Sequence, residues 1–240
     1  VCGMVLAAAK GAAEGAARDA TRLETALRDR LQRVLVQDAA LGLARLHRVA
    51  RHCPAFVRHF ARLYDLLPRT AGEQRATVLE LLKWGSAHSP ELPTYLRASS
   101  AETILRTRDD DAQQLVLEIY LAVLPRMAPA DVMRVLSAGR DVFPAHPCAL
   151  CRQRWYEVAI WVHEHFCSDT NDADAAHTDE NEDLVAVAKE QLVRGLGDAD
   201  RGVRECVREY LHAHVLARDV CGRAAQLLRE RWFVPGAERA

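Results

Sequence analysis

The 240-residue sequence predicts an all-α protein, a right-handed solenoid of about five helical hairpins. Apolar residues recur at helical spacing along most of the chain, and no segment alternates apolar and polar residues as a half-buried strand does. The second helices of successive pairs begin near residues 73, 110, 149 and 201. The last interval matches the others once an acidic insertion of about 14 residues is subtracted from it. A period close to 40 residues made of helix pairs is typical of HEAT and armadillo solenoids.

Residues 1–36 are expected to form an N-terminal helical stretch with no assigned role. The apolar run at residues 1–9 is too short to cross a bilayer, which takes about 20 apolar residues, so we expect no membrane association. No basic residues precede this run, as they would in a secretory signal. Because the chain lacks an initiator Met and is helix-like from its first residues, we expect it to be a fragment of a longer protein.

HEAT-like helical hairpins are expected over residues 37–167, beginning with helices at 37–52, 54–67 and 72–87. Pro54 and Pro68 bound the second of these, because proline fits a first helical turn and blocks a helix interior. The apolar residues expected on the inward faces are Leu41, Ala44, Leu46, Val49, Phe56, Val57, Phe60, Leu63, Tyr64, Leu67, Val78, Leu81, Leu82 and Trp84.

Further helices are expected at residues 101–106, 110–124 and 129–137, followed by a strongly apolar helix after Pro147. Residues 109–111 are all Asp, and they supply an N-cap and first-turn negative charge to the helix that follows. The predicted core includes Leu81, Leu82, Leu115, Ile119, Trp155, Ile160, Trp161, Val203, Val207 and Leu211.

Residues 168–183 carry seven acids, no Lys or Arg and no large apolar side chain, which predicts an acidic flexible loop. The acids do not match an EF-hand in either plausible register, so we expect no calcium site. HEAT-like hairpins then continue the same solenoid over residues 184–240.

The segment 192–211 is the clearest single repeat. Leu192 and Leu196 end one helix, Asp198 caps the turn, and Arg204 lies where HEAT units place a base that bonds the turn. An Asp at this point accepts backbone N–H bonds, and an Arg can bridge it to the next repeat. The apolar residues expected to line the second helix of the pair are Val203, Val207 and Leu211.

The cysteines carry no recognisable chemistry. There are seven, scattered along the chain, which suits a reducing compartment without disulfides. Cys148 and Cys151 form a C-x-x-C motif with His163, His165 and Cys167 downstream, but the intervening helix would separate the two ends by about 18 Å. Zinc ligands lie within about 2.3 Å of one ion, so we expect no metal site here.

No motif of an enzyme active site occurs. The sequence lacks the phosphate-binding patterns Gly-x-x-x-x-Gly-Lys and Gly-x-Gly-x-x-Gly, the kinase patterns His-Arg-Asp and Asp-Phe-Gly, and the hydrolase pattern Gly-x-Ser-x-Gly. We therefore assign no catalytic, cofactor-binding or metal-binding residue, and we expect the isolated chain neither to bind ATP nor to phosphorylate a substrate.

The charge of the chain is nearly balanced. Lys plus Arg is 32 and Asp plus Glu is 33, which excludes a strongly basic nucleic-acid module and an acidic disordered protein. Within residues 37–70, however, there are six arginines and only two acids, Asp38 and Asp65. A ridge of this kind can follow nucleic-acid phosphates, and it can equally be an ordinary solvated face, so both interpretations stay open.

The last third of the hairpin region carries a specific resemblance. A series of short motifs resembles the DNA-dependent protein kinase catalytic subunit family. Before the acidic insertion they are His146-Pro147, Cys151-Arg152, Tyr156 and Trp161-Val162-His163, and after it Ala188-Lys189, Gly195-Leu196 and the Asp198 turn with its helix through Val207. The match is to the helical cradle in the middle of those chains, upstream of the kinase domain. It covers about residues 37–220 and is sharpest over 143–212.

The resemblance implies a function that the residues alone do not. It implies a scaffold segment of a nuclear serine/threonine kinase of the phosphatidylinositol 3-kinase-related group, which acts in DNA double-strand break repair by non-homologous end joining. ATP and magnesium would belong to the distant kinase domain. The implied partners are the rest of the catalytic subunit and, for the whole protein, the Ku heterodimer and DNA ends. The charge of residues 37–70 adds a weak DNA contact as a further expectation. The alternative is a stand-alone HEAT-repeat adaptor that binds proteins.

Overall fold

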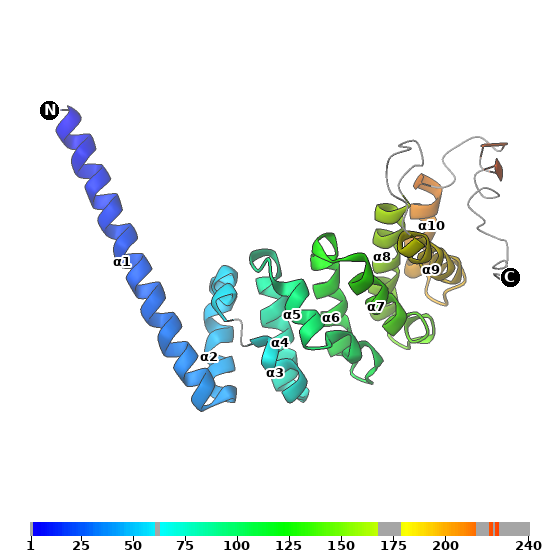
Figure 1. Ribbon diagram of the computed structural model, residues 1–240, viewed down its shortest axis with the longest axis horizontal. Helices are drawn as coiled ribbons and strands as arrows, with labels where there is room; N and C mark the ends of the chain where they lie inside the picture. Colours follow the sequence, from blue (N-terminus) through cyan, green and yellow to red (C-terminus); the bar gives the residue numbers. More distant parts are fainter. Residues whose placement is uncertain (1, 61–62, 168–178, 215–220, 223, 226–240) are drawn as a thin grey trace. The chain divides into compact units, whose positions relative to one another are not determined.

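The computed structural model of the chain describes residues 2–60, 63–167, 179–214, 221, 222, 224 and 225, with side chains described from Asp19 onward except at residues 179 and 180. This described part consists of α-helices and short 3₁₀ helices and contains no strand, which confirms the all-α prediction (Figure 1). The chain divides between Ser89 and Pro90 into two compact units, unit 1 (Val1–Ser89) and unit 2 (Pro90–Ala240). The right hand of the solenoid stays a prediction.

Unit 1 opens with a long helix, α1 (Cys2–Gln37), which packs against α2 (Ala39–His52). Asp38 separates them and caps α2, its Oδ1 accepting the Leu41 N–H at 3.0 Å. Gly42 allows the two backbones to meet, because a Cβ at this position would lie 2.5 Å from the Leu35 Cα. The chain continues through η1 (Pro54–His59), α3 (Leu63–Leu66), η2 (Leu67–Arg69), α4 (Gly72–Gly85) and η3 (Ser86–His88).

Two expectations for unit 1 were wrong. The single helix expected over 54–67 is broken into 3₁₀ and α turns, in which Val57, Phe60 and Leu63 are all buried at the three-residue spacing that suits a 3₁₀ turn. On α2, Leu41 and Ala44 are exposed, and the buried residues are Gly42, Leu43, Leu46 and Ala50. The buried face of α2 differs from the expected one because both α1 and α4 pack on this helix.

Unit 2 is a double row of helices (Figure 1). One row contains α6 (Asp110–Val123), α8 (Ala149–Phe166) and α10 (Arg201–His214), and the other contains η4 (Ala101–Arg106), α7 (Pro129–Gly139) and α9 (Asp179–Leu196). The remaining elements are α5 (Leu92–Ala98), η5 (Leu124–Arg126) and η6 (Phe143–Ala145). The rows share a core in which Tyr120, Phe143, Trp155 and Tyr156 are almost fully buried.

The helices of unit 2 largely follow the sequence expectations. Asp109 caps α6 as predicted, its Oδ1 accepting the Ala112 N–H at 3.0 Å. The helix expected at 101–106 is a 3₁₀ helix, and α5 lies in a segment where no helix was expected. Helix α9 begins at Asp179, so residues 179–183 of the expected acidic loop are helical, since acidic residues favour a helix N-terminus. Residues 168–178 of that loop lie outside the described residues.

Seven of the ten residues predicted for the core are buried, and three are not. Leu115, Ile160 and Trp161 are only half-buried, because they lie on sides of α6 and α8 that no neighbouring helix fully covers. Leu196, expected to close the helix end against the core, is 40% exposed. No helix in the described part of the chain is long and apolar enough to cross a membrane.

Candidate interaction surfaces and the joint between repeats

The turn between α9 and α10 is joined to α8 by a buried ion pair. The Asp198 carboxylate accepts the Arg152 Nε–H at 2.9 Å and the Nη2–H at 3.0 Å, and the two side chains are only 1% and 10% exposed. The hydrogen bond to Asp198 raises the pKa of Arg152 above its already high value, so the guanidinium stays charged. Arg152 Nη1 also donates to the carbonyls of His146 and Pro147, at 2.5 and 3.2 Å.

The turn itself differs in detail from the HEAT expectation. Asp198 does lie in the turn and accepts the Asp200 N–H at 2.8 Å, but the residue that caps α10 is Asp200, whose Oδ1 accepts the Val203 N–H at 3.1 Å. Arg204 bonds the turn as predicted, through Nη1 to the carbonyls of Asp198 and Ala199. In the described residues, a bridge to this turn comes from the preceding repeat, through Arg152. Most of the chain after α10, where a bridge from Arg204 to the next repeat would end, lies outside the described residues.

Polar contacts continue from this pair toward the start of unit 2. His146 Nδ1 accepts the Cys148 N–H at 3.1 Å, which leaves its Nε2–H to donate to Gln113 Oε1 at 2.8 Å. Gln113 in turn donates through Nε2 to the carbonyls of Leu105 and Thr107, both at 2.9 Å. We call Gln113, His146, Arg152 and Asp198 the polar network; all four are buried.

Sequence reasoning found only part of this network. Asp198 was picked out by the HEAT pattern, and Arg152 and His146 entered only as residues of the family resemblance. Gln113 was missed, because a polar residue inside an amphipathic helix carries no signal of its own. Gln113 meets the carbonyls at the end of η4 only because the turn before α6 brings them together in the folded structure.

The C-x-x-C motif lies at the beginning of α8. Cys151 is buried, and its thiol donates to the Asp110 carbonyl at 3.4 Å, while burial raises its pKa to about 12. At the other end of the same 18-residue helix, His163 contacts the Tyr210 hydroxyl at 2.7 Å and His165 stacks on Trp161. The helix therefore keeps the two ends of the Cys/His sequence apart. In the described residues, no three His, Cys, Asp or Glu side chains are grouped so as to hold a metal ion.

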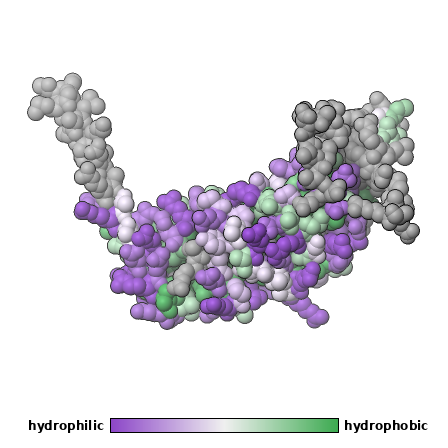
Figure 2. Space-filling model, in the orientation of Figure 1, coloured by the Kyte–Doolittle hydropathy of each residue, from purple (hydrophilic) through white to green (hydrophobic). Residues whose placement is uncertain are grey.

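Three arginines of the basic segment 37–70 have contacts in the described residues. Arg45 and Arg48 of α2 join Arg30 of α1 around a groove of about 300 Å³. Arg58, in contrast, lies 3.7 Å from Glu24. The groove is partly apolar, and its other lining residues are Leu27, Leu31, Val34 and Val49. In the view of Figure 2, much of the described surface is hydrophilic, with smaller hydrophobic areas.

Comparison with known proteins extends the resemblance. The family described as "DNA-PKcs, CC5" matches residues 1–235, which includes residues 1–36. The DNA-dependent protein kinase catalytic subunit of Gallus gallus is 26% identical over 166 residues, which is 69% of this chain and 4% of that protein. The Dictyostelium discoideum protein of the same name is 24% identical over 218 residues, 88% of this chain and 5% of that protein. The chain thus spans about one twentieth of the length of these relatives.

Proposed function

Because the chain belongs to the family described as DNA-PKcs, CC5, we propose that it is a helical scaffold segment of a DNA-dependent protein kinase catalytic subunit. Its role would be in double-strand break repair by non-homologous end joining, in the nucleus. The family match favours this proposal over a stand-alone HEAT-repeat adaptor.

The observation that carries the scaffold role is the polar network. Its members come from α6, from the approach to α8, from α8 itself and from the turn before α10, and Gln113 also bonds carbonyls at the end of η4. The network therefore connects successive repeats of unit 2. A buried charge pair with further hydrogen bonds is strongly unfavourable to break, because one partner is then left charged and buried. Such a joint holds the repeats at a defined angle, which a segment that transmits position through packed helices needs.

In this proposal the segment itself carries no catalysis. Two of its three lysines have described side chains, the exposed Lys83 on α4 and the half-buried Lys189 on α9, and neither follows a glycine-rich loop. A kinase needs a phosphate cradle, a lysine that holds the phosphates and acids or amides that place magnesium. ATP and magnesium would be bound by the distant kinase domain of the whole protein. The partners of the segment would be the rest of the catalytic subunit. The Ku heterodimer and DNA ends would bind the full-length protein.

The direct test is made in the full-length catalytic subunit that contains this segment. Asp198→Ala should lower both DNA-stimulated kinase activity and plasmid end joining, although residue 198 is far in sequence from any kinase motif. Glu182→Ala, a change of an exposed acid on α9, is the matched control and should leave both unchanged. Full activity in the Asp198 variant, with a destabilised segment, would contradict the scaffold role.

A second test concerns ATP. Calorimetry of the 240-residue chain with magnesium-ATP should give no saturable binding, and a peptide kinase assay should give no product. Saturable ATP binding that is lost when a single lysine is changed would mean that the segment has a nucleotide site.

Weak DNA contact by residues 37–70 is also part of the proposal, supported by the three arginines that surround the groove between α1 and α2. DNA binding followed by fluorescence anisotropy should weaken steeply with salt, by about 0.9 in log Kd per log salt for each phosphate contacted. Arg45→Ala with Arg48→Ala should weaken it further, and Arg69→Ala, at an exposed arginine of η2, should not. Equal binding by both variants would argue against this surface.

A further inference from the structure

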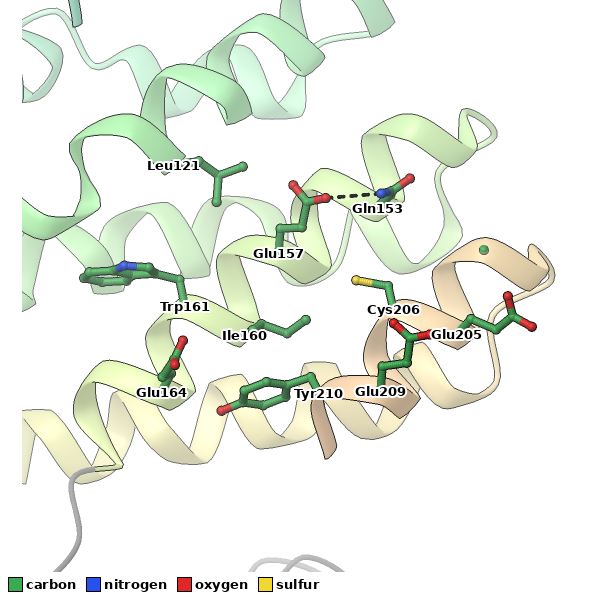
Figure 3. Close-up of a pocket in the computed structure, with 11 residues that line it drawn as sticks. Leu121, Gln153, Glu157, Ile160, Trp161, Glu164, Glu205, Cys206, Glu209 and Tyr210 are labelled. Carbon is green, nitrogen blue, oxygen red and sulfur yellow. Dashed lines mark hydrogen bonds between the residues drawn. The ribbon is translucent and has the colours of Figure 1, made fainter. Parts of the chain in front are cut away.

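Unit 2 has an open groove of about 700 Å³ between α8 and α10, bordered by α6 (Figure 3). We call it the acidic groove. On α8 its lining residues extend from Gln153 to Glu164, which is about 16 Å at 1.5 Å per residue, or three helical turns. On α10 they begin at Gly202, which has no side chain to close that end. The groove is therefore open and elongated along the two helices.

The floor of the acidic groove is apolar and incompletely covered. Leu121, Ile160 and Trp161 line it, and all three are half-buried. Trp161 is held in place by stacking on His165, with the ring centroids 4.0 Å apart. A partly exposed Trp beside aliphatic side chains is the kind of residue that carries much of the binding energy in protein interfaces.

The rim of the acidic groove is negative. Glu157, Glu164, Glu205 and Glu209 line it, and no Lys or Arg is among the eleven lining residues (Figure 3). Glu157 and Glu205 each bond an arginine one helical turn earlier, Arg154 at 2.7 Å and Arg201 at 2.8 Å; neither arginine lines the groove. His214 lies 3.9 Å from Glu164. A rim of carboxylates repels nucleic acid and favours a cationic ligand.

We propose that the acidic groove binds a basic amphipathic helix of a partner protein. Such a helix, about three turns long, would place apolar side chains at positions i, i+3 or i+4, and i+7 on Ile160 and Trp161, with flanking Arg or Lys residues against the glutamates. The groove length, the apolar floor and the charge of the rim all match this ligand. The proposal goes beyond the scaffold role and does not depend on it, because the groove and the polar network share no residue.

The test uses the 240-residue chain and a synthetic, fluorescein-labelled peptide of about 18 residues, with Leu at helical spacing and Arg on both flanks. Two control peptides have the same length, one with Glu in place of every Arg and one with the Leu positions scrambled. Fluorescence anisotropy should show saturable binding of the basic amphipathic peptide alone. Equal binding of all three peptides, or no binding of the first, would overturn the proposal.

Variants of the chain locate the binding. Glu205→Arg with Glu209→Arg should weaken binding of the basic peptide roughly tenfold, since two attractive contacts at the rim become repulsive. The same variant should bind the Glu-containing peptide more tightly than the unchanged chain does. Glu182→Arg, an equal change of charge on α9, is the matched control and should bind as the unchanged chain. Equal weakening by both variants would mean that net charge alone governs binding.

Trp161→Ala should weaken binding at least tenfold while leaving the helical circular dichroism intact, because Trp161 is only half-buried. Unchanged affinity in this variant would overturn the proposal. Sedimentation velocity of the unchanged chain tests whether a second copy of the chain occupies the groove. Dimers that dissociate in the Glu205→Arg, Glu209→Arg variant would mean that a second copy, rather than a partner helix, fills it, and would overturn the proposal.

Discussion

Units 1 and 2 join their helices in different ways. In unit 2, the polar network is buried and crosses from one repeat to the next through the bidentate pair of Arg152 and Asp198. In unit 1, a polar link between α2 and α4 is the contact of His47 with Glu80 at 2.7 Å, and these side chains are 31% and 43% exposed. His47 also packs on the Trp84 ring, with centroids 4.8 Å apart.

The difference shows where each unit obtains its specificity. A buried pair adds little net stability over an apolar contact, but it is very costly to break, so it defines one geometry of the joint. An exposed pair contributes little in either direction, because water and salt screen it. The joints of unit 1 depend more on shape, at Gly42 and around buried residues such as Phe56 and Val57. They also include a buried hydrogen bond between the Tyr64 and Ser89 hydroxyls at 3.0 Å.

The largest expected effect is that of Asp198→Ala. This change leaves the Arg152 guanidinium buried without its carboxylate, and we expect it to lower the free energy of unfolding by about 3–5 kcal/mol. Urea unfolding measures the loss, and hydrogen exchange should show it in unit 2. Arg152→Met with Asp198→Leu removes both charges and should recover most of the stability. A double variant no more stable than Asp198→Ala would mean that the charges contribute more than their replacement by apolar side chains can.

The next effect tests the joint of unit 1. Gly42→Ala would place a Cβ 2.5 Å from the Leu35 Cα, and a backbone atom cannot move away without shifting α1 on α2. We expect a net loss of about 1–2 kcal/mol, after the gain in helix propensity of Ala over Gly. Gly197→Ala is the control, because its nearest neighbour would be 3.6 Å away. Thermal unfolding should show a lower Tm for the first variant, and an unchanged Tm would show that α1 is free to move.

The helix caps should be equivalent in the two units. Asp38→Ala and Asp109→Ala each remove a carboxylate that accepts a backbone N–H at 3.0 Å, and each should cost about 1 kcal/mol. Asn at either position should retain most of the stability, since its side-chain oxygen can accept the same bond. Urea unfolding of the four variants measures this. A much larger loss at one site would mean that the Asp there has a further partner.

The smallest effect is expected at the exposed link of unit 1. Glu80→Gln should change the free energy of unfolding by less than about 1 kcal/mol, because the pair with His47 is about one third exposed. Comparison of urea midpoints at low and high salt measures this small change. A loss near that of Asp198→Ala would erase the contrast between the two units.

Much of the architecture could be predicted from spacing alone. Helical periodicity located α4, α6, α7 and α8 to within a few residues, and three Asp residues in a row marked the start of α6. The HEAT pattern located the turn at Asp198 and the bond that Arg204 makes to it. These features follow from interactions within one or two turns of the chain, which the local order of residues determines.

What the local order could not determine is which face of a helix meets a neighbour. Trp155 and Trp161 lie on the same apolar helix, yet the first is fully buried and donates its Nε1–H to Gln191 of α9, while the second borders the acidic groove. Asp198 pairs with Arg152, 46 residues earlier in the chain. Both outcomes depend on where α9 and α10 pack, because contacts between repeats form only when separate helices are brought together. The sequence by itself therefore determined most of the helices, the Asp109 cap and the spacing of the helix pairs, and only the tertiary structure decided which residues form the joint and the groove.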